Sequence, residues 1–112
     1  MDMEEMLKAA QAAAEKIQQQ MSDVQVTLDS LEVEGSSGGG LVKIRATAKG
    51  RILSVAIDDS LIVPEDKQML EDLVTAAFND ARAKADQAAD AEMQKAQSGM
   101  GLPPGLKLPG MG

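Results

Sequence analysis

Residues 41–58, LVKIRATAKGRILSVAID, contain the pattern that decides the fold. Apolar and polar residues alternate on both sides of Lys49-Gly50, and this period of two is typical of strands with one buried and one solvated face. Gly50 suits a tight turn because glycine adopts positive φ without steric cost. The stretch therefore predicts a β-hairpin with a two-residue loop. Lys43, Arg45 and Thr47 would lie on the solvated face. The predicted cross-strand pairs are Ala48 with Arg51, Ala46 with Leu53, Ile44 with Val55 and Val42 with Ile57.

The hairpin also contains the densest group of basic residues in an acidic chain. The 112 residues include 11 Lys+Arg and 18 Asp+Glu, which gives a net charge of −7. Any polyanion must therefore be bound at a few places, against general repulsion. An alternative interpretation is that cations on an exposed strand only protect it from aggregation. The four cations are Lys43, Arg45, Lys49 and Arg51.

A long helix is predicted upstream of the hairpin. Apolar residues from Met3 to Val24 recur in steps of four and three, without Gly or Pro, which is a heptad seam. Polar residues of low helix propensity predict that the helix ends near residues 25–28. A short half-buried strand should follow at 31–35, and the run GSSGGG at 35–40 is expected to be a flexible connection. The seam either packs on the second helix of its own chain or pairs with another protomer.

A second helix is predicted from about residue 64 to 97. Pro64 followed by two acidic residues is a helix-start signal. The first half, from Met69 to Ala81, is apolar over a wide arc and should lie on the sheet, whereas the Ala-rich second half should project as an arm. Residues 98–112 are rich in Gly and Pro, so we expect a disordered tail after a domain of residues 1–97.

The composition excludes several classes of function. The chain has no His, Cys or Tyr, so the usual nucleophiles and proton-transfer groups are missing and an enzyme is not expected. No metal site, cofactor or small-molecule substrate is expected, and the adjacent Asp58 and Asp59 are interpreted as a solvated turn. Phe78 is the sole aromatic residue, so the chain lacks the aromatic side chains on which the bases of single-stranded nucleic acid would stack. The scarcity of large residues also suggests that a second copy of the chain completes the hydrophobic core.

No long apolar run is present, and the first residues are acidic where a signal peptide would be basic and then apolar. We therefore expect a soluble, intracellular protein without a membrane partner.

Several short segments along nearly the whole chain carry a resemblance to one family. They are Met6–Gln11 (MLKAAQ), Gly39–Ile44 (GGLVKI), the Lys49-Gly50 turn with Ile57-Asp58, Met69–Leu73 (MLEDL), Ala76–Ala81 (AAFNDA) and Met100–Leu106 (MGLPPGL). In this order and spacing, they resemble the YbaB/EbfC family of bacterial nucleoid-associated proteins.

The resemblance implies an α+β fold in which a helix, a three-stranded antiparallel sheet and a second helix follow one another. It implies a homodimer with joined sheets and tweezer-like helical arms, which binds double-stranded DNA with little sequence preference. The implied location is the cytoplasm and nucleoid, and the implied role is nucleoid organisation and gene regulation. We expect the dimer interface to include Val42, Ile44, Leu53, Val55, Leu70, Leu73 and Phe78.

In this family the helical arms are the proposed DNA contacts. The candidate DNA-binding residues are the arm cations Lys8, Lys16, Arg82, Lys84 and Lys95, together with the strand cations Lys43 and Arg45. Acidic neighbours at helical spacing offer a second interpretation of the arm cations, as ordinary surface ion pairs.

Two alternative functions remain open. Eight Met residues and coiled-coil arms are also typical of a DNA-independent adaptor or a prefoldin-like chaperone, because Met adapts to varied apolar partners. A third hypothesis assigns DNA contact to a complex with a partner, bound through the apolar residues Leu102, Leu106 and Leu108 of the tail.

Overall fold

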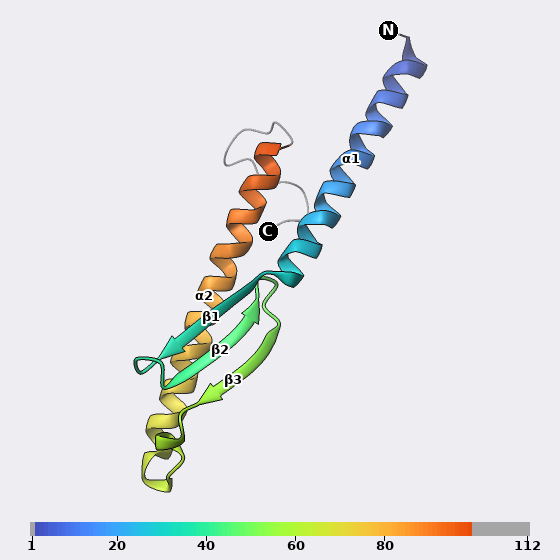
Figure 1. Cartoon of the computed structure of the whole chain (residues 1–112). Coiled ribbons are helices and arrows are strands. Elements are labelled where there is room, and N and C mark those ends of the chain that lie inside the picture. The colour runs from blue at the N-terminus through green and yellow to red at the C-terminus, as the bar shows by residue number, and fades with distance from the viewer. Residues whose placement is uncertain (1, 100–112) are drawn as a thin grey trace.

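The computed structural model describes residues 2–99 of the chain (Figure 1). The expected order of a helix, three strands and a long helix is confirmed, and the predictions about residues 100–112 lie outside the described residues. The elements are α1 Met3–Ser30, β1 Glu32–Ser37, β2 Val42–Thr47, β3 Ile52–Ile57, two short 3-10 turns at Asp59–Leu61 and Pro64–Asp66, and α2 Lys67–Gly99.

Helix α1 begins with a side-chain cap and ends later than the sequence predicted. The Asp2 carboxylate accepts a hydrogen bond of 2.8 Å from the backbone N–H of Glu5, which satisfies one of the free donors at the helix start. The helix continues to Ser30 instead of ending near residues 25–28. Leu28 is buried against the second half of α2 and Ala48. This burial outweighs the low helix propensity of the surrounding residues.

The sheet is antiparallel in the order β1-β2-β3. The predicted pairs Val42–Ile57 and Ile44–Val55 are confirmed. The pairing of Ala46 with Leu53 is wrong, because an irregularity between Arg45 and Ala46 shifts the register and places Ile52 opposite Ala46.

The β2–β3 loop has three residues, not two. The N–H of Thr47 donates to the carbonyl of Arg51, which leaves residues 48–50 in the loop, and Gly50 has the expected positive φ of 95°. Thr47 was expected to be exposed but is buried, and its hydroxyl accepts a hydrogen bond from the N–H of Arg51. The extra loop residue therefore explains why the predicted pairs fail near the turn and hold away from it.

Strand β1 includes half of the run that was expected to be a flexible connection. Gly35, Ser36 and Ser37 belong to the strand and pair with β2, and Gly38 to Gly40 form the turn together with Leu41. These three glycines have positive φ values, which other residues rarely adopt. The connection is thus a tight glycine turn.

Helix α2 begins at Lys67, after the Pro64–Asp66 turn, and ends two residues beyond the predicted residue 97. Its first half lies mainly across β1 and β2, as expected, and leaves β3 largely uncovered (Figure 1). The main core contains the buried residues Val42, Ile44, Leu61, Ala77 and Ala81. A second, smaller core joins the two helices and contains Val24, Leu28 and Ala48, with Ala88, Ala89, Met93 and Ala96 against them.

The protomer is elongated. Its extents are 76 × 22 × 17 Å, and its radius of gyration of 20.5 Å exceeds the value of about 13 Å expected for a compact chain of this length. Figure 1 shows that α1 and α2 diverge as they leave the sheet. Residues 3–19 of α1 are all exposed. None of the helices within residues 2–99 combines the length and apolar character needed to cross a bilayer.

Candidate nucleic-acid interface

The candidate DNA-binding cations of α2 are engaged with acidic neighbours on the same helix. Arg82 Nε lies 3.5 Å from Asp86 Oδ1, and Lys95 Nζ lies 3.4 Å from Glu92 Oε1. Both cations are well exposed, and such exposed pairs contribute little to stability and exchange readily with solvent. These two arm cations are therefore accessible to a ligand, but their charge is partly neutralised.

Lys84 has a different environment, because it joins α2 to the edge of β1. Its Nζ donates to the backbone carbonyl of Glu34 at 3.1 Å and to Asp80 Oδ2 at 3.0 Å. The same Asp80 oxygen accepts a hydrogen bond of 2.9 Å from the N–H of Ser36. The Ser36 and Lys84 hydrogen bonds lower the pKa of Asp80 below its ordinary value. Lys84 thus has a structural role in holding β1 against α2.

The basic residues of α1 lie on the projecting part of that helix. Lys8 and Lys16 are exposed, and within residues 2–99 no carboxylate lies within 4.0 Å of either ammonium group. They are about eight residue positions apart on the helix, which corresponds to about 12 Å along the axis. Among the candidates on the two helices, these two cations have the least compensated charge.

The strand cations lie on a different surface from the arm cations. Lys43 and Arg45 lie on the face of the sheet opposite α2, since the alternating residues Val42 and Ile44 are buried beneath that helix. Arg45 is paired with Glu32 on β1, whereas Lys43 has no ion-pair partner within residues 2–99. The structure does not bring these residues together with Lys8 and Lys16, because α1 leaves the sheet (Figure 1).

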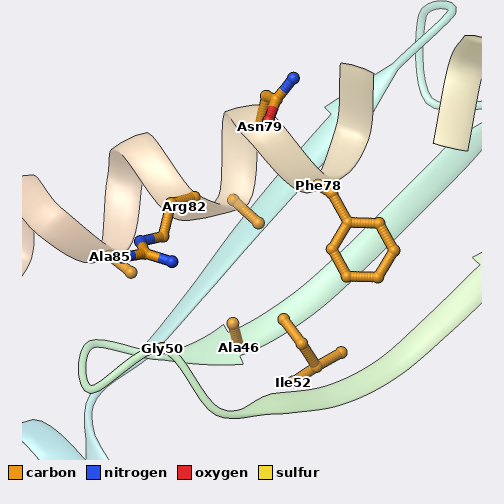
Figure 2. A pocket seen from close by; sticks show the side chains of 8 residues that line it. Ala46, Gly50, Ile52, Phe78, Asn79, Arg82 and Ala85 are labelled. Carbon is orange, nitrogen blue, oxygen red and sulfur yellow. The ribbon is translucent and has the colours of Figure 1, made fainter. Parts of the chain in front are cut away.

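An apolar surface lies beside α2, where β3 is uncovered. An open groove of about 300 Å³ lies between α2 and the β2–β3 hairpin. Figure 2 shows the Phe78 ring pointing towards Ile52. Phe78 and Ile52 are 39% and 42% exposed, and Val55 and Ile57 on β3 are 45% and 36% exposed. The sequence predicted Phe78 and Val55 as interface residues but not Ile52, because the register shift places Ile52 on this face.

The other predicted interface residues lie deeper in the protomer. Val42 and Ile44 have no exposed surface and belong to the core beneath α2, so they have no surface to offer to a partner in this conformation. Leu53, Leu70 and Leu73 are half-buried. The residues available for contact are therefore those on β3 and the neighbouring face of α2.

The fold and its charge distribution define a class of small α+β protein with a three-stranded sheet and projecting helices that carry basic residues. The chain belongs to the YbaB/EbfC DNA-binding family, whose sequence model matches residues 1–100. This is a family of DNA-binding proteins and not of enzymes.

Two relatives support the assignment, and a solved structure shares the fold. A nucleoid-associated protein of Methylocella silvestris is 49% identical over 108 residues, which cover 96% of this chain and 97% of that protein. A nucleoid-associated protein of Nitrobacter hamburgensis is 50% identical over 95 residues, covering 85% and 90%. The crystal structure of the uncharacterized protein HP0035 from Helicobacter pylori has the same fold, with a TM-score of 0.59 and 23% identity over 70% of this chain and 90% of that chain.

Proposed function

We propose that the protein is a homodimer that binds double-stranded DNA with little sequence specificity and contributes to nucleoid organisation and gene regulation. The observation that carries this proposal is membership of a DNA-binding family over residues 1–100. The names of the relatives support a location in the nucleoid.

The proposed dimer joins the two sheets through β3. The two edges of the sheet differ: Asp80 and Lys84 of α2 hydrogen-bond to the outer edge of β1, whereas within residues 2–99 no group beyond β2 hydrogen-bonds to β3. An open edge strand is a template for pairing with another chain. Pairing two β3 strands would bury Val55, Ile57 and the neighbouring Phe78, which a single protomer leaves exposed.

The proposed DNA contacts are phosphate contacts from the helical arms. Lys8 and Lys16 are the leading candidates because neither has an ion-pair partner within residues 2–99. Arg82 and Lys95 can join them by exchanging their helix partners for phosphate. Lysine contacts to phosphate carry no sequence information, which accounts for low specificity. Because dimerisation doubles the chain's net charge of −7, we expect micromolar or weaker binding at physiological salt.

The test is fluorescence-anisotropy binding to two unrelated duplexes over a series of salt concentrations, with the mass in solution measured in parallel. We expect a dimer that binds both duplexes alike and loses affinity as salt rises. The Lys8→Glu/Lys16→Glu variant should bind at least about tenfold more weakly, since each lost phosphate contact removes counterion release. Lys43→Glu/Lys49→Glu, with the same change of charge on the hairpin, is the matched control. Equal losses in both variants would contradict the assignment to α1.

A DNA-independent adaptor is the second candidate function. The observation that favours it is the exposure of large apolar residues on the projecting part of α1, namely Met3, Met6, Leu7 and Ile17. Failure of a well-folded dimer to bind either duplex at low salt would favour this candidate over DNA binding.

A further inference from the structure

The heptad seam of α1 is covered over only part of its length. Near the sheet, Val24 and Leu28 are buried against Ala89, Met93 and Ala96 of α2. Towards the N-terminus, the seam residues Ile17, Ala14, Ala10, Leu7 and Met3 are exposed, with Leu7 at 58% and Ile17 at 42%. A continuous apolar stripe of about four helical turns thus lacks a partner among residues 2–99.

Helix α2 ends close to the point where the cover on this seam stops. Both helices project from the same end of the sheet, and α1 runs towards the sheet whereas α2 runs away from it (Figure 1). The α2 residues Met93 and Ala96, which pack in the cluster with Val24, are therefore among its last. Gly99 follows only three residues after Ala96. One turn beyond Val24 on α1, the side-chain oxygen of Gln20 is buried and accepts no hydrogen bond from residues 2–99. The chain therefore leaves α2 beside an exposed apolar stripe and an unpaired acceptor.

The 13 residues that follow have a composition suited to this surface. Residues 100–112 contain three Leu, three Pro and two Met, with Lys107 as the one charged residue. From Gly99 to Leu108 an extended proline-rich segment spans about 28 Å, whereas α1 rises about 20 Å from Gln20 to Leu7. The segment is thus long enough to reach the whole stripe. The prolines also lower the conformational entropy lost when such a segment is ordered.

We propose that the C-terminal segment of this chain, residues 100–112, docks on the α1 seam of its own protomer, with Leu102, Leu106 and Leu108 against the stripe from Ile17 to Leu7. A backbone N–H at the start of the segment would donate to Gln20. The proposal goes beyond DNA binding and does not depend on it. Lys8 and Lys16 lie more than 100° around the helix axis from the centre of the seam, so the docked segment leaves both cations free.

The test uses the absence of native cysteine from the chain. In full-length protein, Ala10→Cys combined with Gly105→Cys places one thiol on the seam and one in the C-terminal segment. The matched control combines Ala12→Cys with Gly105→Cys, because Ala12 is exposed like Ala10 but lies 200° further around the helix. After mild oxidation, we expect at least fivefold more intrachain disulfide in the seam variant, at a yield independent of protein concentration.

Two results would overturn the proposal. Equal disulfide yields from the two variants would mean that the segment does not select the seam. A disulfide between chains, formed on mixing single variants Ala10→Cys and Gly105→Cys, would mean that a second copy is the occupant.

A second measurement avoids new thiols. Hydrogen exchange of the amides of residues 7–17 should accelerate at least threefold in the full-length variant Leu102→Ser/Leu106→Ser/Leu108→Ser, while exchange in β2 stays unchanged as a control for folding. Unchanged exchange in residues 7–17 would count against docking. None of these outcomes depends on whether DNA binds, so failure of this proposal and failure of the proposed function are distinguishable.

Discussion

Gly35 on β1 and Ala81 on α2 are in backbone contact: a Cβ atom on Gly35 would lie 2.3 Å from the backbone nitrogen of Ala81 and 2.5 Å from the carbonyl oxygen of Ala77. The helix approaches the strand this closely because the strand has no side chain here and the facing helix residues are alanines, which are buried. This contact fixes the height of α2 above the sheet. It also brings Asp80 and Lys84 within hydrogen-bonding distance of β1.

The first prediction is that Gly35→Ala destabilises the protein. The clashing atoms are backbone atoms, which cannot move aside as a flexible side chain can. We expect the free energy of unfolding, measured by urea denaturation at fixed protein concentration, to fall by about 1–3 kcal/mol. Gly39→Asn is the control, because Gly39 has open space around it and Asn tolerates its φ of 68°. A Gly35 variant as stable as this control would contradict the close contact.

The second prediction concerns the proposed dimer. Val55→Asp places a carboxylate on the apolar face of β3, where burial against a second copy would leave it without a partner. We expect the dimer dissociation constant, measured by analytical ultracentrifugation, to rise more than about tenfold, or about 1.4 kcal/mol.

Ala56→Asp is the matched control for Val55→Asp. Ala56 is the next residue of β3 and is also exposed, but it pairs with Lys43 on the opposite face of the sheet. Equal weakening by both variants would argue against an interface on the α2 side of β3.

The sequence predicted the elements well because each of them has a strong local signal. The heptad steps predict α1, and the alternation of apolar and polar residues predicts β2 and β3. Pro64 predicts the turn that directly precedes α2. The errors near the β2–β3 turn come from one extra loop residue, whereas the error at the end of α1 comes from a distant contact. The end of α1 depends on the burial of Leu28 against α2, which no local propensity reports.

The candidate DNA-binding residues were separated only by the structure. In sequence, Lys8 and Lys84 look alike, since each follows an acidic residue at helical spacing, Glu4 and Asp80 respectively. In the fold, Lys84 also donates to the carbonyl of Glu34, which is 50 residues away along the chain. Spacing within a helix cannot predict such a contact, because it depends on how α2 crosses β1.

The third prediction concerns the start of α1. Asp2→Ala removes the acceptor for the N–H of Glu5 and should weaken the first turn by about 1 kcal/mol. Because residues 3–19 are exposed, we expect the effect to remain local. Hydrogen exchange of amides 4–8 should accelerate about fivefold without a change in the urea midpoint of the whole protein. Asp2→Asn, which keeps an acceptor oxygen, should restore most of the protection, and a lowered urea midpoint for Asp2→Ala would show that the turn is coupled to the core.

The fourth prediction is a pH dependence that arises from Asp80. Its pKa is lower in the folded protein than the ordinary value of 3.8, because the carboxylate accepts hydrogen bonds from Ser36 and Lys84. A carboxylate with a depressed folded pKa contributes stability above its unfolded pKa, and this contribution is lost as the pH falls through the folded pKa. Wild-type protein should therefore be more stable than Asp80→Asn at pH 7, and the difference should shrink as the pH falls below about 4.

Urea unfolding of both proteins between pH 7 and pH 2 measures this difference, in which the titration of the other carboxylates cancels. Asp90→Asn removes one negative charge from the same helix, but within residues 2–99 its side chain has no hydrogen-bond partner on β1, so it controls for net charge. A gap between wild type and Asp80→Asn that stays constant down to pH 2 would mean that the charge on Asp80 does not hold β1 to α2. The lower stability of Asp80→Asn would then arise only because the Asn amide accepts the hydrogen bond from the Ser36 N–H less well than the Asp80 carboxyl group does.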